Sequence, residues 1–187
     1  MLEVGAGDGR LAALLADSGY DVVAIDPRPG AEHVVPVSLL DLPVPEQSFD
    51  AALAVLSLHH VKPLPESCRK LARLVRPGGC LVVDEFDVER LDAAAAAWWI
   101  GQRAATGRDH PGDAAQMIAE MQRELHPVRV LREELERFFV LGEPVRGPYL
   151  HRWDLEPGLR DAEERLIAAG RLPAMGARLV GTRRADG

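Results

Sequence analysis

Residues 1–10, MLEVGAGDGR, carry glycine at alternate positions, Gly5, Gly7 and Gly9. A short apolar run precedes these glycines, and residues 10–19, RLAALLADSG, follow them with leucines at helical spacing. The glycines therefore fall in a turn from a strand to a helix, where glycine permits a positive φ and lets a ligand approach the backbone. The start of the helix adds unpaired N–H groups and the positive end of its dipole. The stretch suits a polar, nucleotide-like ligand, although the same glycines also serve an ordinary tight turn.

The next apolar run, residues 21–26, DVVAID, predicts a parallel strand that is buried on both faces. Asp26 ends this run seventeen positions after Gly9, close to the spacing at which an acid reaches a ribose in dinucleotide-binding folds. A carboxylate there can accept hydrogen bonds from both ribose hydroxyls. The alternative is a solvated loop acid before Pro27. A nicotinamide dinucleotide fingerprint needs the spacing G-x-G-x-x-G, whereas this chain has G-x-G-x-G with Glu3 just before it.

The stretch LEVGAGDG resembles motif I of the class I S-adenosylmethionine-dependent methyltransferases, an acid followed by a Gly-x-Gly-x-Gly loop. The resemblance continues in order along the chain. VVAID is similar to the family's second strand, LLDLPVPEQSFDAALAVLSLHHV to its adenine-binding acid and fourth strand, and LARLVRPGGCLVVDEF to a helix, a turn and the fifth strand. The resemblance covers residues 1–86 well and the rest of the chain in outline.

The resemblance implies the fold and the cofactor. The fold is a doubly wound, mostly parallel, Rossmann-like α/β sheet, with a helical insertion after the fifth strand and a C-terminal antiparallel strand pair. The cofactor is S-adenosyl-L-methionine. Asp26 is expected to bind its ribose, and Asp41 its adenine amino group, with the Leu42 backbone beside it. The expected cofactor-binding residues are Glu3, Gly5, Ala6, Gly7, Gly9, Asp26, Pro27, Asp41, Leu42 and Ser57.

Methyl transfer from a sulfonium needs alignment of the acceptor and a base where the acceptor must lose a proton. His59 and His60 are the candidates for this base, because imidazole titrates near neutral pH. Neighbours in an extended segment point in opposite directions, so one of the two is expected to face the cleft. Packing or substrate positioning is the alternative for both. Asp84 and Glu85, which end the fifth strand, are the second choice.

Composition bounds the function further. A chain of 187 residues is most simply one domain, residues 1–187, with residues 87–137 as a helical cover over the substrate. A net charge of −7 argues against a nucleic-acid partner, which needs a concentrated positive face. Cys68 and Cys80 lack metal-ligand spacing, so we expect no metal, and they fit a reducing cytoplasm. The sequence has neither an apolar run of membrane length nor a basic leader, so we expect no membrane partner.

The helical patterns after residue 86 place Trp98 and Trp99 on or near one face, where they could wall an acceptor pocket or simply pack in the core. His110, His151 and Arg152 lie in or near the same region and could bind an acidic or phenolic acceptor, or be surface residues.

Methyltransferases of this family usually carry helices before the first strand, whereas residues 1–4 begin this sequence. We therefore expect an open side that a homo-oligomer or another partner covers, or else weak cofactor binding. The expected function is methyl transfer to a small-molecule acceptor. The alternatives are a non-catalytic nucleotide-binding or interaction module of the same ancestry and, less favoured by the glycine spacing, an NAD(P)-dependent oxidoreductase.

Overall fold

The computed structural model describes residues 1–109, 113–153, 155–156 and 158–185. The chain divides into two compact units. The first, which we call the sheet unit, comprises Met1–Glu85, Arg129–Pro144 and Arg178–Gly187. The second, which we call the helical unit, comprises Phe86–Val128 and Val145–Ala177. That the whole chain forms one domain stays a prediction.

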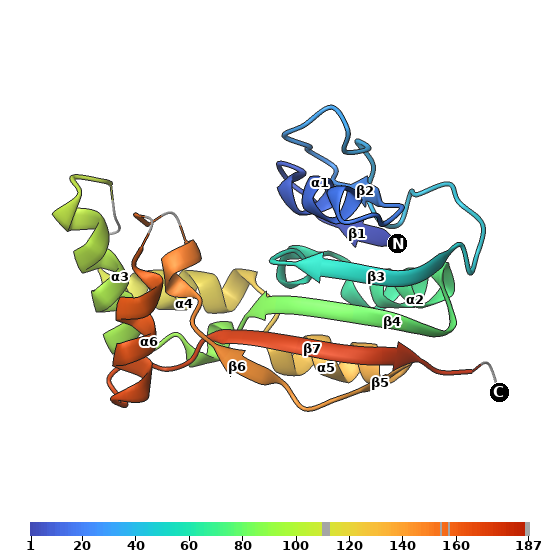
Figure 1. Ribbon diagram of the computed structural model, residues 1–187. Helices are drawn as coiled ribbons and strands as arrows, with labels where there is room; N and C mark the ends of the chain where they lie inside the picture. Colours follow the sequence, from blue (N-terminus) through green and yellow to red (C-terminus); the bar gives the residue numbers. More distant parts are fainter. Residues whose placement is uncertain (110–112, 154, 157, 186–187) are drawn as a thin grey trace. The chain divides into compact units, whose positions relative to one another are not determined.

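The strands form a sheet with the order β2-β1-β3-β4-β7-β5, and β6 pairs with β7 off this path (Figure 1). β1 is parallel to β2 and to β3, and β3 is parallel to β4, whereas β5 and β7 are antiparallel. This topology confirms the predicted Rossmann-like sheet and its C-terminal antiparallel pair. The strands are β1 (Leu2–Val4), β2 (Val23–Ile25), β3 (Phe49–Val55), β4 (Val75–Phe86), β5 (Phe139–Leu141), β6 (Val145–Gly147) and β7 (Gly176–Arg183).

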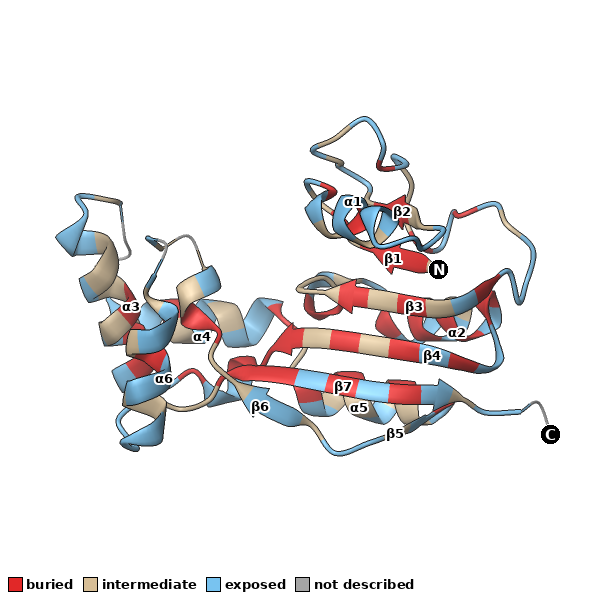
Figure 2. Ribbon diagram, in the orientation of Figure 1, coloured by how far each residue is buried: buried red, intermediate tan, exposed pale blue. Residues whose placement is uncertain are grey.

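Side chains alternate between the two faces of the sheet. Leu2 and Val4 pair in register with Ala52 and Ala54 and are buried (Figure 2). The helices α2 (Leu64–Leu74) and α5 (Val128–Glu136) lie behind the strands in Figure 1 and cover this face. Glu3 points to the opposite face. There α1 (Arg10–Asp17) packs through a small core of Ala6, Ala12, Ala24 and Val34.

The segment between β2 and β3 has little regular structure. A single parallel bridge joins Ile25 to Val35, where the family resemblance would place a third strand. The run AALAVLSLHHV after Asp50 predicts a fourth strand that ends near His59, whereas β3 starts at Phe49 and ends at Val55. Leu56 then adopts a φ of 53°, which an L-residue other than glycine rarely adopts, and breaks the extended run. Residues Leu58–His60 form the 3-10 helix η1 instead.

The helical unit confirms the predicted helical insertion after residues 81–86, LVVDEF. It holds η2 (Val88–Arg90), α3 (Ala93–Ala105), α4 (Ala114–Glu124), η3 (Leu150–Arg152) and α6 (Arg160–Ala168). Asp92 caps α3 by accepting a hydrogen bond from Ala95 N at 2.8 Å, as N-cap carboxylates do. Trp99 is buried; its ring stacks on Trp153 at 4.5 Å and its Nε1 donates to the Trp153 carbonyl. Core packing therefore accounts for Trp99, while Trp98 is half-buried.

His151, the middle residue of η3, hydrogen-bonds to Glu163 of α6, and Arg152 is exposed. His110, the third residue predicted for this region, lies outside the described residues. Among the described residues, no helix combines the length and the apolar character needed to span a bilayer.

Candidate functional site

Gly5, Gly7 and Gly9 all adopt positive φ, at 73°, 54° and 71°. At two of these positions a neighbouring side chain occupies the place of a Cβ atom, so only glycine fits. A Cβ on Gly5 would collide with Ser57, and one on Gly9 would collide with His33. A Cβ on Gly7 would meet no described atom within 4 Å, so Gly7 faces open space. We call residues 5–9 the Gly loop. It combines a left-handed backbone with one position that leaves room for a ligand.

Asp26 connects the end of β2 to the Gly loop. Gly7 N donates to Asp26 Oδ2 at 3.0 Å, and Arg28 N donates to Oδ1 at 2.8 Å. Gly5 N donates to the Ile25 carbonyl at 2.9 Å. Each carboxylate oxygen of Asp26 thus accepts one backbone N–H and keeps further acceptor capacity, because an ionised carboxylate has about four lone-pair sites.

Glu3 lies in the middle of β1 with 3% of its surface exposed. Its Oε2 is buried and has no hydrogen-bond partner among the described atoms. Burial raises the pKa of this carboxyl above its ordinary value of 4.5; Asp8 also raises it, and His33 lowers it. A buried acceptor without a partner beside the Gly loop needs a donor from a ligand or from water. This is what the resemblance to motif I implies for Glu3, and it fits a cofactor that carries hydrogen-bond donors.

The turn after β3 is held by a carboxylate from the neighbouring strand. Glu85 ends β4 with its side chain fully buried. Its Oε1 accepts hydrogen bonds from Ser57 N at 3.0 Å and from Leu58 N at 2.6 Å, while its Oε2 contacts His59 Nδ1. Ser57 Oγ donates to the Val4 carbonyl at 2.8 Å, which ties the same turn to β1.

The two histidines have different surroundings. His59 is buried, with 4% of its surface exposed, and its ring is bound to Glu85. His60 is exposed and lines a cavity, with its ring centroid 4.2 Å from that of His59. Asp84, the other predicted acid on this rim, accepts two hydrogen bonds from the Arg178 guanidinium. His60 is therefore the imidazole of this pair that a molecule in the cavity can reach.

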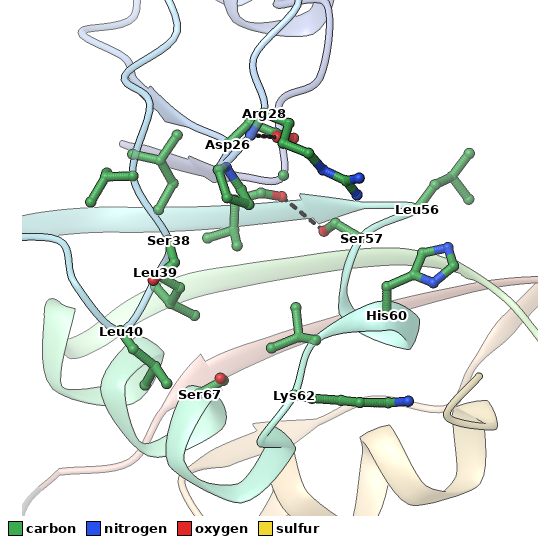
Figure 3. Close-up of a pocket in the computed structure, with 16 residues that line it drawn as sticks. Asp26, Arg28, Ser38, Leu39, Leu40, Leu56, Ser57, His60, Lys62 and Ser67 are labelled. Carbon is green, nitrogen blue, oxygen red and sulfur yellow. Dashed lines mark hydrogen bonds between the residues drawn. The ribbon is translucent and has the colours of Figure 1, made fainter. Parts of the chain in front are cut away.

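The cavity has a volume of about 570 Å³ and lies where the strand order reverses, at the C-terminal ends of β1, β2 and β3 (Figure 3). Five residues predicted for the site line it: Gly5, Asp26, Pro27, Ser57 and His60. Its other lining residues are Val4, Ile25, Arg28, Val37, Ser38, Leu39, Leu40, Leu56, Val61, Lys62 and Ser67.

The remaining predicted residues lie around the cavity and are not part of its lining. Asp41 is exposed and accepts a hydrogen bond from Ser38 Oγ, at 2.6 Å, and Ser38 lines the cavity. Leu42 is buried, and its carbonyl accepts a hydrogen bond from Lys70 Nζ at 3.1 Å. The other members of this group are Glu3, Ala6, Gly7 and Gly9 of β1 and the Gly loop, and His59.

Sequence reasoning missed several lining residues, among them Arg28, Ser38 and Lys62. Arg28 and Lys62 each lie two positions after a predicted site residue, and Ser38 lies three before Asp41. Proximity to a predicted residue was the available signal. It does not tell which of several neighbours faces the cavity.

The fold and this cavity define a Rossmann-like α/β protein with a cavity at the point where the strand order of its sheet reverses. Residues 2–83 match the family model described as a methyltransferase domain. An uncharacterised methyltransferase of Mycobacterium tuberculosis is 37% identical over 91 residues, covering 43% of this chain and 37% of that protein. A demethylmenaquinone methyltransferase of Tropheryma whipplei is 34% identical over 102 residues, covering 48% of this chain and 43% of that protein. The chain thus spans less than half the length of these curated relatives.

A solved structure shares the fold across nearly the whole chain. The crystal structure of an S-adenosylmethionine-dependent methyltransferase from Mesorhizobium loti has a TM-score of 0.63 at 19% identity, covering 97% of this chain and 90% of that one. The family model thus matches the N-terminal part of the chain, residues 2–83, and the likeness to the solved methyltransferase, at 19% identity, shows that the two proteins share a fold. The solved methyltransferase is named for its dependence on S-adenosylmethionine, the cofactor that the sequence resemblance implies for this chain.

Proposed function

We propose that this chain binds S-adenosyl-L-methionine in the cavity beside the Gly loop and catalyses methyl transfer to a small-molecule acceptor. One observation carries the proposal: Gly5, Asp26 and Ser57, from the ends of three different strands, line a single cavity at the switch point of a parallel sheet. Open α/β sheets bind their ligands at this position. The name of the demethylmenaquinone methyltransferase relative supports a small-molecule acceptor.

The cofactor would be held mainly by acceptors for its ribose and amino groups. Asp26 would accept hydrogen bonds from the ribose hydroxyls, using the lone pairs that Gly7 N and Arg28 N leave unused. Glu3 would accept a hydrogen bond through its unpartnered Oε2. Asp41 would accept from the adenine amino group, with the Leu42 backbone beside it. Gly5, Ala6, Gly7, Gly9, Pro27 and Ser57 would provide the surrounding surface.

When bound, the cofactor supplies an electrophilic methyl group on a sulfonium that leaves as a neutral thioether. The residues of this chain then align the acceptor with that methyl group, which is worth a large share of the barrier when the geometry is right. His60 is the proposed base, since its imidazole is exposed on the cavity wall and can take the proton that an acceptor O–H or N–H loses. His59, bound to Glu85, would position the turn that carries His60.

Calorimetry with three ligands tests the proposal. We expect S-adenosyl-L-methionine and S-adenosylhomocysteine to bind and NAD not to bind. Binding of NAD alone would favour the oxidoreductase alternative. Turnover against a panel of small-molecule acceptors then separates an enzyme from a binding module, because the module would bind the cofactor without releasing S-adenosylhomocysteine.

Partners other than the acceptor stay predictions. Nucleic acid and membrane are not part of the proposed function. We infer that the chain forms a homo-oligomer or binds a further partner. In the sheet unit, Val140 and Val180 expose 57% and 48% of their surfaces, and exposed apolar side chains that cluster mark interaction surfaces. Light scattering on the purified chain gives the molecular mass that tests this expectation.

A further inference from the structure

The cavity wall carries two long cations that the proposed cofactor does not require. Arg28 and Lys62 both line the cavity and are exposed. In the described parts of the chain, neither lies within ion-pair distance of a carboxylate. Two other arginines of the sheet unit are paired: Arg76 with Asp50 and Arg178 with Asp84. The charge of Arg28 and of Lys62 is therefore available to a ligand.

The two cations extend toward the same end of the cavity. In Figure 3 the Arg28 guanidinium, the His60 ring and the Lys62 ammonium lie on one side of the view, and Leu39 and Leu40 lie on the other. We call the side with Arg28, His60 and Lys62 the basic end of the cavity; Leu56 also lies on this side. His60, the proposed base, belongs to the basic end.

The charge balance of the cavity favours an anion there. Its charged lining consists of one acid, Asp26, and the two cations. S-adenosyl-L-methionine carries a sulfonium, an ammonium and one carboxylate, so it adds a further positive charge. Arg28 and Lys62 are exposed, so solvent screens their repulsion of the sulfonium, and Asp41 and Glu3, which the proposed function assigns to the cofactor, lie outside the lining. Within the lining itself the cations outnumber the acid, which favours an anion beside them. The chain as a whole carries a charge of −7, which would repel an anion in the absence of such a local basic site.

We propose that the acceptor is an anionic small molecule, an ionised carboxylic acid, held at the basic end of the cavity by Lys62 and Arg28. This inference rests on the proposed function, because it names the acceptor class for the same site. A guanidinium binds a carboxylate through two parallel N–H donors, and an ammonium binds it as a point charge. The acid also neutralises the excess positive charge beside the sulfonium. Binding of the acid and of the cofactor therefore support each other.

The competing explanation is that the two cations bind the carboxylate of the cofactor itself. The two explanations differ in what Lys62→Met and Arg28→Met do to the affinities of S-adenosyl-L-methionine and S-adenosylhomocysteine. Both ligands carry the carboxylate, but only the first carries the sulfonium. Loss of a cation that binds the cofactor carboxylate would weaken both ligands together. If the cation instead binds a different anion, its loss removes a repulsion of the sulfonium. The affinity for S-adenosyl-L-methionine would then rise relative to that for S-adenosylhomocysteine.

The quantity to compare is the ratio of the affinities for S-adenosyl-L-methionine and S-adenosylhomocysteine. Isothermal titration calorimetry on the full chain measures it in Lys62→Met, Arg28→Met and the control Arg69→Met. Arg69 is exposed on α2 and does not line the cavity. We expect each cavity variant to raise the affinity for S-adenosyl-L-methionine relative to S-adenosylhomocysteine by roughly two- to tenfold, the size of a screened charge repulsion. Arg69→Met should leave the ratio unchanged. A parallel loss of both affinities in the cavity variants would overturn the inference.

A second titration uses acids and their neutral amides on protein saturated with S-adenosylhomocysteine. The probe pairs are benzoate and benzamide, hexanoate and hexanamide, and malonate and malonamide. At least one acid should bind more tightly than its amide, and Lys62→Met should remove the preference while Arg69→Met keeps it. If S-adenosylhomocysteine binds but no acid is preferred, the acid inference is wrong and the proposed function stands. If neither cofactor form binds the wild-type chain, the proposed function is wrong and this inference falls with it.

Discussion

Glu85 is expected to determine both the stability of the sheet unit and the shape of its cavity. Its fully buried carboxylate accepts the backbone N–H groups of Ser57 and Leu58, and it contacts His59 Nδ1. Glu85→Ala removes these acceptors and leaves two N–H groups without partners in the turn after β3. Each such group costs about 1–3 kcal/mol, so the two together should lower the free energy of unfolding by roughly 2–6 kcal/mol. That is a large part of the stability of an ordinary domain, which is about 5–15 kcal/mol.

The same turn carries Ser57 and His60 into the cavity, so ligand binding should fall with stability. Glu85→Gln keeps one carbonyl oxygen for both backbone donors and should lose less stability than Glu85→Ala. Urea unfolding gives the free energies, and calorimetry with S-adenosylhomocysteine, at a temperature where each variant is folded, gives the affinities. We expect the order wild type, Glu85→Gln, Glu85→Ala in both measurements.

The helical unit offers a matched control. Glu163 is also fully buried and accepts hydrogen bonds from Tyr149 N at 2.7 Å, Leu150 N at 2.8 Å and His151 N at 2.9 Å. Glu163→Ala should therefore destabilise the protein at least as much as Glu85→Ala, without changing the lining of the cavity. Equal losses of S-adenosylhomocysteine affinity in the two variants would refute the positioning role of Glu85. So would a Glu85→Ala variant within about 0.5 kcal/mol of wild type in unfolding free energy.

Four further predictions concern single groups. Asp26→Ala should weaken S-adenosyl-L-methionine at least about tenfold in calorimetry, because hydrogen bonds to a charged acceptor are worth about 1.5–3 kcal/mol each; an unchanged affinity in the folded variant would remove Asp26 from the ribose site. Gly7→Val should abolish binding while circular dichroism shows the fold retained, since a branched side chain would fill the open side of the loop, and normal binding would make Gly7 only a turn residue. The raised pKa of Glu3 means that its folded form holds its proton to higher pH than the unfolded chain; its stabilising effect is complete below about pH 4.5 and is lost as pH rises through the raised pKa. The unfolding free energy of Glu3→Gln should therefore gain on wild type as pH rises above 4.5, and a constant difference would contradict the raised pKa. Burial raises the pKa of the Cys68 thiol to about 12, so iodoacetamide at pH 8 should label exposed Cys80 and spare Cys68, which mass spectrometry of tryptic peptides distinguishes.

The sequence alone indicated most of the local elements and the resemblance of residues 1–86 to a methyltransferase domain. The spacing of Gly5, Gly7 and Gly9 between an apolar run and a helical pattern predicted a left-handed loop, and all three adopt positive φ. The order of the motifs predicted the Rossmann-like sheet and the helical insertion, which the structure confirms. It also implied S-adenosyl-L-methionine as the cofactor, which is part of the proposed function. Such features are legible because side-chain periodicity and glycine placement act over a few residues.

Only the tertiary structure decided which residues surround the cavity. His59 and His60 are adjacent in the sequence and chemically identical, yet one is buried and the other is exposed. The separation arises because Leu56 breaks β3 with a positive φ and Glu85, 26 positions from His59, binds the first histidine. Arg28 and Lys62 line one cavity because they follow different strands. The C-terminal ends of these strands lie together only in the folded sheet. Contacts of this kind depend on strand order and on long-range hydrogen bonds, and no pattern within a short window of sequence contains them.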